Sequence, residues 1–460
     1  MRGVLKGVVL LAGTAWISTT RAIELDIDDP ASIKSAASTI AYGLMSYYNG
    51  NTTGTVGFFP GYWWEAGAAW GAMIDYWFFT QDPTYNDVVS QALLSQVSPT
   101  NDFMPLAVQN QEGNDDQAFW GFAAMSAVER RFPSLPSPAP SWLELAENVF
   151  DDMVHRWDNG SLGTPGSCNG GLKWQIFSSN NGYDYKNAPS NGGLFQIAAR
   201  LARYTGNHTY LNWAETTWDW MSGVGLINSY YQVFDGTGDT TNCTTVDHDQ
   251  WSYNIGMVMY GAAVLANYTD DPLWRTRTIG LLEWSVNFFS PFPNATAIMY
   301  EAQCETNSVC DDDQKSFKAY LARWMAASTQ MVPDIQDAVD MLLRPSAQGA
   351  ARGCSGGSDG VTCSTKWYLD GWDGTWGIGQ QLSALEVVQG LLINNTDAPV
   401  VLPNVDIVPQ TITSTVALSP VTSATAVAIS HLPAAAGRRN SARASLALVV
   451  GITIATFWLA

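Results

Sequence analysis

The chain has 460 residues, more than one typical domain, although a single helical barrel can hold this length. It carries 42 acidic against 22 basic residues, and the net charge of -20 disfavours nucleic acid as a partner, because phosphates must be neutralised by Lys and Arg. Apolar residues make up 46%, which allows a large core, and the 20 Trp and 18 Tyr residues are unusual. Aromatic faces build cores and also stack on sugar C–H groups, so the composition somewhat favours a carbohydrate ligand.

The first residues have the pattern of a secretory signal peptide. Arg2 and Lys6 precede an apolar run over residues 8–17, and Thr20-Arg21-Ala22 provides a small-x-small cleavage site. We therefore expect residues 1–22 to be removed and the mature chain to start near Ile23.

The last residues have the order of a glycosylphosphatidylinositol (GPI) anchor signal. Alanines at 434–436 and a polar stretch at 437–445 precede apolar residues 446–460, and Asn440-Ser441-Ala442 offers a second attachment site. A tail-anchoring helix is the weaker alternative, because this apolar run is shorter than the roughly 20 residues needed to span a bilayer. We expect residues 437–460 to be removed and the protein to be GPI-anchored to the membrane, at the outer face of the plasma membrane or in the cell wall.

Six cysteines lie between these two signals, and in a secreted chain they are expected to form disulfides. Short loops favour two pairs and leave the third, although spacing alone leaves other pairings open. The favoured pairs are Cys304–Cys310, Cys354–Cys363 and Cys168–Cys243.

Seven N-x-S/T sequons also fit the secretory route, and each is expected to be exposed and glycosylated. They begin at Asn51, Asn159, Asn207, Asn242, Asn267, Asn294 and Asn394.

The body of the chain shows apolar helical periodicity in twelve segments, separated by Pro and Gly, with no sustained strand pattern. The expected helices are 31–48, 62–80, 84–96, 115–131, 141–157, 189–205, 208–222, 252–268, 273–289, 314–330, 334–344 and 376–393. Polar and aromatic residues cluster in alternate connections. This arrangement predicts six inner and six outer helices, an all-α (α/α)6 barrel that forms one catalytic domain over residues 23–395.

Residues 396–436 are rich in Val, Thr, Ser, Ala and Pro and lack helical periodicity. Such a composition is typical of an extended, O-glycosylated stalk. An edge strand within 400–415 is the alternative.

The most informative stretch is NQEGNDDQAFWGFAAMSAVERR at residues 110–131. Asn114 followed by Gln117 fits a capping box, which places Asp115 and Asp116 in a first helical turn beside unpaired backbone N–H groups. The helix dipole alone favours one Asp there, so a structural role is the alternative. Two like charges in succession, beside polar and aromatic groups that suit a sugar, indicate carboxylates that face a cleft.

Further polar and aromatic stretches precede other helices and are candidates for the same cleft, although ordinary turn chemistry explains any one of them. They are Tyr62–Glu65, Asn169–Gln175, Asn187–Gly193, Asp247–Asn254 and Asp370–Trp376.

Two acidic groups are weak candidates for a metal site. Asp247 and Asp249 flank His248, and residues 311–313 are three aspartates similar to the magnesium-binding clusters of terpene-processing helical proteins. Acids are common in the first turn of a helix, so we expect no metal.

A set of motifs resembles glycoside hydrolase family 76 over residues 23–395. In chain order they are WWEAGAAWG, NDDQAFW, SNGGLFQIAARLARYTG, WSYNIG, FKAYLARWM and DGWDGTWGIGQQLSALE. The set is similar in particular to the GPI-anchored fungal mannan endo-1,6-α-mannosidases. The resemblance implies an (α/α)6 barrel, cleavage of α-1,6-linked mannose backbones with retention, and no metal or other cofactor. For the fungal branch it also implies transglycosylation onto a β-glucan acceptor, and the donor is either mannan or a GPI glycan.

Carried over to this chain, the resemblance makes Asp115 the nucleophile and Asp116 the acid/base. A retaining glycosidase needs one ionised carboxylate and one protonated carboxyl, and repulsion between neighbours leaves a proton on one of them. Adjacent residues of a regular helix point about 100° apart, so a distorted first turn is expected. The expected sugar contacts are Trp63, Trp64, Trp251, Tyr253, Asn254 and Trp376, with Lys318 and Arg323 as supports.

Two other readings compete with a mannosidase. A non-catalytic mannan-binding or wall-structural protein would have no need for costly paired carboxylates. A helical terpene-cyclase-like enzyme is disfavoured by the signals for secretion and glycosylation. Hydrolysis and transfer share one glycosyl-enzyme intermediate, so the sequence leaves both open.

Overall fold

In the computed structural model the described residues are 22–407 and 416–418, without residue 54 and residues 159–167. The expected signal peptide up to residue 21, most of the expected stalk, the anchor signal and Asn159 lie outside them. Among the helices within these ranges, none is both long and apolar enough to cross a membrane.

The described chain contains twelve helices of ten or more residues, one for each expected segment, and a short helix α2 (Gly50–Thr53). The twelve are α1 (Pro30–Met45), α3 (Trp63–Thr80), α4 (Asn86–Ser95), α5 (Asn114–Glu129), α6 (Trp142–His155), α7 (Ala188–Thr205), α8 (His208–Gly223), α9 (Ser252–Thr269), α10 (Pro272–Ser285), α11 (Phe317–Met331), α12 (Gln336–Gly353) and α13 (Ile378–Gln389). The largest error is the expected end at residue 344, because α12 continues through an internal Pro345.

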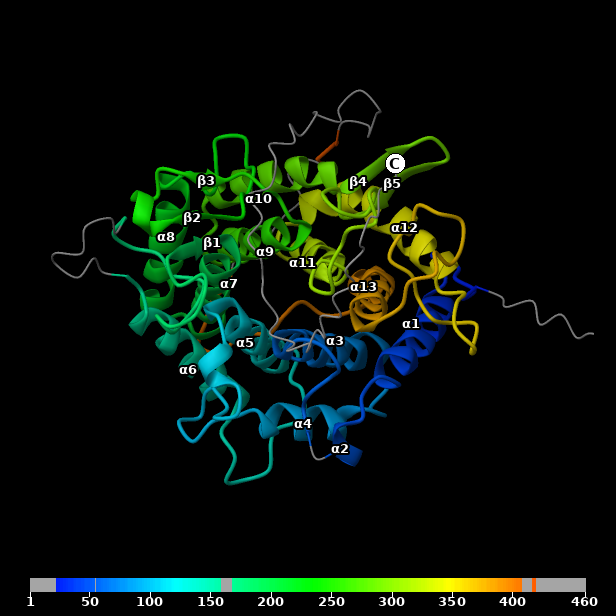
Figure 1. Cartoon of the computed structure of the whole chain (residues 1–460), viewed down its shortest axis with the longest axis horizontal. Helices are drawn as coiled ribbons and strands as arrows, with labels where there is room; N and C mark the ends of the chain where they lie inside the picture. Colours follow the sequence, from blue (N-terminus) through cyan, green and yellow to red (C-terminus); the bar gives the residue numbers. More distant parts are fainter. Residues whose placement is uncertain (1–21, 54, 159–167, 408–415, 419–460) are drawn as a thin grey trace, which may run out of the picture.

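The helices form two concentric rings (Figure 1). Helices α3, α5, α7, α9, α11 and α13 form the inner ring, in which each packs against the next and α13 closes onto α3. Helices α1, α4, α6, α8, α10 and α12 cover the outside. The predicted (α/α)6 barrel is therefore confirmed.

The two rings differ in how their helices are buried. Inner helix α5 is buried at 14 of its 16 residues, whereas outer helix α6 buries only a stripe that includes Leu145, Val149 and Met153. A helix buried on all sides belongs inside a core, and a stripe at helical spacing belongs on its surface. Glycine permits close approach between inner helices, because a Cβ on Gly256 of α9 would lie 2.9 Å from the Cα of Leu321 in α11.

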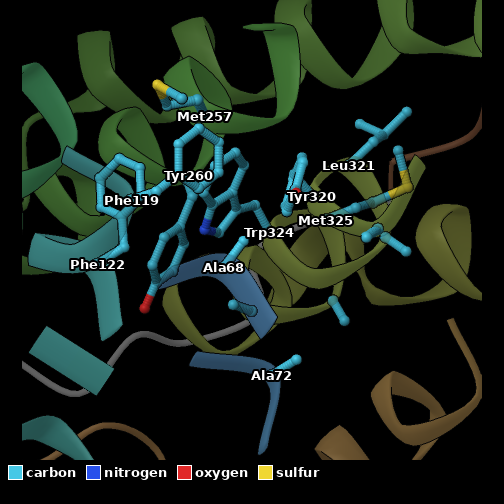
Figure 2. Packing of buried hydrophobic residues seen from close by; sticks show 14 of the residues in the cluster. Ala68, Ala72, Phe119, Phe122, Met257, Tyr260, Tyr320, Leu321, Trp324 and Met325 are labelled. Atoms are coloured by element: carbon cyan, nitrogen blue, oxygen red, sulfur yellow. The ribbon is translucent and has the colours of Figure 1, made fainter. Parts of the chain in front are cut away.

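Aromatic side chains fill the inner ring, as Figure 2 shows. Phe119 of α5 lies 4.8 Å from Tyr320 of α11, and Phe122, one turn further along α5, lies 5.3 Å from Trp324 (ring centroids). These contacts join two helices on different sides of the ring, so the barrel interior is a packed core.

Two short antiparallel sheets lie in the connections. The first has β1 (Tyr185–Asn187), β2 (Gly236–Gly238) and β3 (Val246–Asp247) in that order, and the second pairs β4 (Phe289–Phe292) with β5 (Ala295–Met299). The first sheet matters for function, because β1 leads directly into inner helix α7 and sets the position of Asn187.

The three favoured disulfides, Cys168–Cys243, Cys304–Cys310 and Cys354–Cys363, are all present. Of the sequon asparagines, Asn207, Asn242, Asn294 and Asn394 are exposed, as expected. The expected exposure of Asn267 is wrong. Its side chain is 6% exposed and accepts a hydrogen bond from Nε of Arg203 at 2.7 Å, so it faces the interior from the C-terminal turns of α9.

The first part of the expected stalk lies against the barrel. The backbone N–H of Val400 donates to the carbonyl of Glu129 at 3.0 Å, and that of Leu402 donates to Tyr204 at 3.0 Å. Both acceptors are at the C-terminal ends of inner helices α5 and α7. Residues 400–407 contain no strand, although the rest of the 400–415 alternative lies outside the described residues.

Charged groups are buried between the inner helices on the side away from the helix N-termini. Asp75 of α3 is 1% exposed, and its carboxylate lies 2.8 Å from Nε of Arg130 and 2.7 Å from Nε of Arg323. Such an arrangement costs desolvation energy, which the attraction between the charges offsets only while all partners are present.

We expect Asp75→Ala to lower the free energy of unfolding by about 3–5 kcal/mol, because it removes the carboxylate that Arg130 and Arg323 share. Arg323 then keeps only the longer contact with Glu386, at 3.6 Å. Urea unfolding followed by tryptophan fluorescence measures this change.

Asp312→Ala is the matched control, since Asp312 pairs with Lys315 and has a 75% exposed side chain. The control should cost less than about 1 kcal/mol. Equal losses in the two variants would contradict the importance of the buried pair.

Candidate active site

A cleft of about 490 Å³ opens at the end of the barrel where the inner helices begin. Its lining comes from the starts of α3, α5, α7, α9 and α11 and the connections that precede them. The unpaired N–H groups of these first turns give that end a partial positive charge. The fold therefore favours negative groups there.

Asp115 and Asp116 both line this cleft from the first turn of α5. Oδ2 of Asp116 accepts the backbone N–H of Gly113 at 2.7 Å, while Oδ1 of Asp115 accepts the N–H of Asp116 at 3.0 Å. Asn187 at the start of α7 donates through Nδ2 to the other oxygen of Asp115 at 2.8 Å. The two carboxylates thus reach one cleft from a continuous helix, and the expected distortion of its first turn is not needed.

The expected capping box of Asn114 and Gln117 is wrong. The cap residue is Gly113, and Asp116 binds its N–H. Asn114 instead fixes the start of α5 to the loop that precedes β1. Its backbone N–H donates to the carbonyl of Trp174 at 2.8 Å, and its Nδ2 donates to that of Lys173 at 2.9 Å.

Nine of the nineteen described residues that line the cleft are aromatic. Trp63, Trp64 and Tyr253, three of the expected sugar contacts, line it. The Trp63 ring stacks on Trp120 with centroids 4.9 Å apart, and Tyr253 stacks on Phe317 at 4.0 Å. Rings held by such stacking present a fixed apolar face to a ligand. The other aromatic lining residues are Phe58, Tyr62, Phe119, Trp174, Tyr185 and Phe317.

Three other expected contacts are outside the described lining. Trp251 packs edge-on against Phe317, and Asn254 is only 1% exposed. Trp376 is 65% exposed on the loop before α13.

The expected supporting roles of Lys318 and Arg323 are wrong. Nζ of Lys318 lies 2.7 Å from Oε1 of Glu305, above the ring of Trp367, and Arg323 pairs with Asp75. Both cations are buried, and their partners are structural carboxylates rather than the aspartate pair. Sequence reasoning favours a solvated face for such residues, and it cannot show which acid a buried cation meets.

Tyr185 and Asp235 are cleft residues that sequence reasoning missed. The Tyr185 hydroxyl donates to Oδ2 of Asp235 at 2.8 Å. The first sheet brings together segments about fifty residues apart, and no local pattern in either segment predicts this pair. Burial, followed by the charge of Asp235, raises the pKa of Tyr185, so the phenol stays protonated and can donate.

Carboxyl groups are the only ionisable acids of the described lining apart from tyrosines, and there are five. The carboxyl groups are Glu112, Asp115, Asp116, Asp235 and Asp313. Among the described lining residues none is a lysine or an arginine. Burial, and then the charges of Asp235 and Asp115, raise the pKa of Tyr253 well above its usual value. The cleft therefore suits a neutral or cationic ligand rich in hydroxyl groups, and it disfavours an anion.

The acids of the two weak metal candidates each have other partners in the structure. Asp313 accepts from Nε1 of Trp64 at 3.0 Å, Asp312 pairs with Lys315, and Asp249 accepts from Gln303 at 3.0 Å. Within the described ranges, no three His, Cys, Asp or Glu side chains form a metal-binding group. Two adjacent carboxyl groups within an aromatic cleft can act as nucleophile and as acid/base on a bound sugar.

Sequence comparisons give a family and close relatives. The model of Glycosyl hydrolase family 76 matches residues 32–402. A Saccharomyces cerevisiae protein named mannan endo-1,6-alpha-mannosidase DCW1 is 50% identical over 385 residues, which cover 83% of this chain and 83% of that protein. A Candida albicans protein of the same name is 46% identical over 402 residues, covering 86% and 87%.

Solved structures agree with the fold. Dfg5 from Chaetomium thermophilum, in complex with glucosamine, superposes with a TM-score of 0.78 at 38% identity and covers 84% of this chain and 96% of its own. An inactive variant of an alpha-1,6-mannanase from Salegentibacter, in complex with alpha-1,6-mannotriose, has a TM-score of 0.61 at 17% identity, with 78% and 99% covered. The second likeness shows the fold alone.

The pKa of Asp235 predicts a pH effect on stability. Burial, opposed by the Tyr185 hydrogen bond and assisted by Asp247 and Asp249, raises this pKa from 3.8 to about 6. Between these values the folded protein holds a proton that the unfolded chain releases, so this group lowers stability as the pH rises. We expect Asp235→Asn to match the wild type in urea unfolding at pH 3.5 and to exceed it at pH 7. A difference independent of pH would contradict the shift.

Proposed function

The chain belongs to glycosyl hydrolase family 76, and on this premise we propose that it cleaves internal α-1,6-mannosidic bonds with Asp115 and Asp116 as its catalytic residues. The observation that carries the proposal is the adjacent carboxyl pair within an aromatic cleft. The names of the relatives support the linkage.

We propose a retaining double displacement, the reaction for which such a pair of carboxyl groups serves as nucleophile and acid/base. Asp116 gives its proton to the glycosidic oxygen while Asp115 attacks the anomeric carbon, which forms a glycosyl ester and releases the first part of the chain. In the second step Asp116 takes a proton from the acceptor, which is water or a sugar hydroxyl. The oxygen of this acceptor attacks the same carbon, and the ester bond to Asp115 breaks. Asn187 favours Asp115 as the nucleophile, since its amide N–H orients the carboxylate and stabilises its charge.

The acceptor decides the outcome. Water gives hydrolysis of mannan, whereas a sugar hydroxyl gives transfer. The aromatic wall supports transfer as a second outcome, because rings that hold an acceptor chain also exclude water. We propose a β-glucan chain as the acceptor and either mannan or a GPI glycan as the donor, in remodelling of a fungal cell wall.

Asp115→Asn and Asp116→Asn should each reduce turnover of unbranched α-1,6-mannooligosaccharides by about 10²–10⁴-fold or more, because each removes a group that acts in the transition state. Mass-resolved product analysis follows the reaction: shortened chains show hydrolysis, and lengthened chains show transfer.

Asp312→Asn is the control, since its exposed carboxylate pairs with Lys315. Wild-type activity in both active-site variants would contradict the assignment. Binding by the wild type without cleavage or lengthening would favour a non-catalytic mannan-binding protein.

We also propose that the protein reaches the cell surface and is held there by a GPI anchor. The support is the order of the terminal segments, with a signal-like start and small, polar and apolar stretches at the end. Phosphatidylinositol-specific phospholipase C should release the full-length protein from membranes. A chain cut after residue 433 should be secreted without treatment, and retention of the full chain after lipase treatment would contradict the anchor.

A further inference from the structure

Glu112 is a buried carboxyl at the edge of the cleft, between the short 3-10 helix Gln109–Gln111 and the cap residue Gly113. The residue is one of those that line the cleft, yet it is only 2% exposed. The loop before α5 therefore places a third carboxyl group next to the catalytic pair.

Neither carboxyl oxygen of Glu112 has a hydrogen-bond partner among the described residues. Buried polar groups in folded proteins are almost always partnered, and an unpartnered one carries a desolvation cost. Arg156 acts on Glu112 through its charge but makes no hydrogen bond to it. Nη1 of Arg156 donates instead to Oδ1 of Asn114 at 3.0 Å and to Oε1 of Gln117 at 2.6 Å. A cost that the folded protein leaves uncompensated at its active site points to a ligand group as the missing partner.

Burial and the charges that face Glu112 together determine its protonation state. The charged groups are Asp116 on α5, Asp102 in the loop after α4, and Arg156 at the end of α6. Burial, and then the negative charge of Asp116, raise the pKa of Glu112 to about 9, while Arg156 opposes the shift. Glu112 is therefore neutral at pH 7, and a neutral carboxyl has one O–H donor and a carbonyl acceptor.

We propose that Glu112 is a third active-site carboxyl, which in its neutral form donates to and accepts from hydroxyl groups of the mannose residue bound beside Asp116. This role rests on the proposed function, since it requires a hydroxyl-rich sugar in the cleft. A sugar hydroxyl both donates and accepts a hydrogen bond, and so does a neutral carboxyl group. Binding of the sugar therefore gives Glu112 the hydrogen-bond partners that it lacks among the described residues. Glu112 binds and orients the sugar and takes no part in the proton transfers.

The test measures binding of unbranched α-1,6-mannotetraose by isothermal titration calorimetry in an Asp115→Asn background. That substitution stops turnover and leaves in place the three charged groups that face Glu112. Two variants are added to it. Glu112→Gln keeps a donor and an acceptor in nearly the same shape but cannot ionise, and Glu112→Leu removes both.

At pH 6 we expect Glu112→Leu to weaken binding about tenfold and Glu112→Gln to stay within about threefold, as for the loss or retention of hydrogen bonds to a bound ligand. Between pH 7 and 10 the Asp115→Asn protein should lose affinity as Glu112 ionises, whereas the variant that also carries Glu112→Gln should not. A merely structural glutamate would change the melting temperature but not this pH profile.

Equal affinities and equal pH profiles with and without Glu112→Gln would overturn the inference while leaving the proposed function intact. If Glu112→Leu does not fold, the pH comparison with Glu112→Gln still decides. Absence of binding by the Asp115→Asn protein and by the wild type would overturn the proposed function and this role together.

Discussion

Helix α5 is buried along nearly its whole length, and the rest of the structure depends on this constraint. Because the helix cannot rotate or slide without exposing apolar residues, its sequence fixes what appears at each depth. Asp115 and Asp116 lie at the cleft, Phe119 lies at its floor, and Phe122 packs one turn deeper against α11. At the far end Glu129 pairs with Arg200 of α7 at 2.7 Å. The position of the carboxyl pair is thus set by packing over the full barrel.

The cleft gathers carboxyl groups that would repel one another in a less favourable setting. Helix N-termini, the N–H of Gly113 and the amide of Asn187 stabilise charge on the catalytic pair. Glu112 has none of these donors and remains neutral. The same end of the barrel therefore holds carboxyl groups in different protonation states. Hydrogen-bond donors favour the ionised form of a carboxyl group, and burial favours the neutral form. Within the catalytic pair itself, a double displacement needs one ionised carboxylate and one protonated carboxyl.

Sequence periodicity predicted the helices well, because inner and outer helices bury apolar residues in patterns that are visible along the chain. The aspartate pair was also predictable, since its position at a helix start is a local property. Partners distant in sequence were not. Lys318 and Arg323 are buried and meet Glu305 and Asp75, far from the catalytic pair in sequence. Tyr185 meets Asp235 only through the first sheet. Asn267 shows the same limit, because a sequon does not reveal whether its asparagine is buried in the folded protein.

The described residues of the tail after α13, 400–407 and 416–418, lie on the side of the barrel away from the cleft. Val400 and Leu402 bind the C-terminal ends of α5 and α7, and Val416 donates to the carbonyl of Asp334 in the turn between α11 and α12. All three contacts lie at the end of the barrel opposite the N-termini that surround the cleft. The described part of the tail therefore lies at the end of the barrel opposite the cleft. It leaves the mouth of the cleft uncovered, so a long polymer such as mannan can enter without displacing this segment.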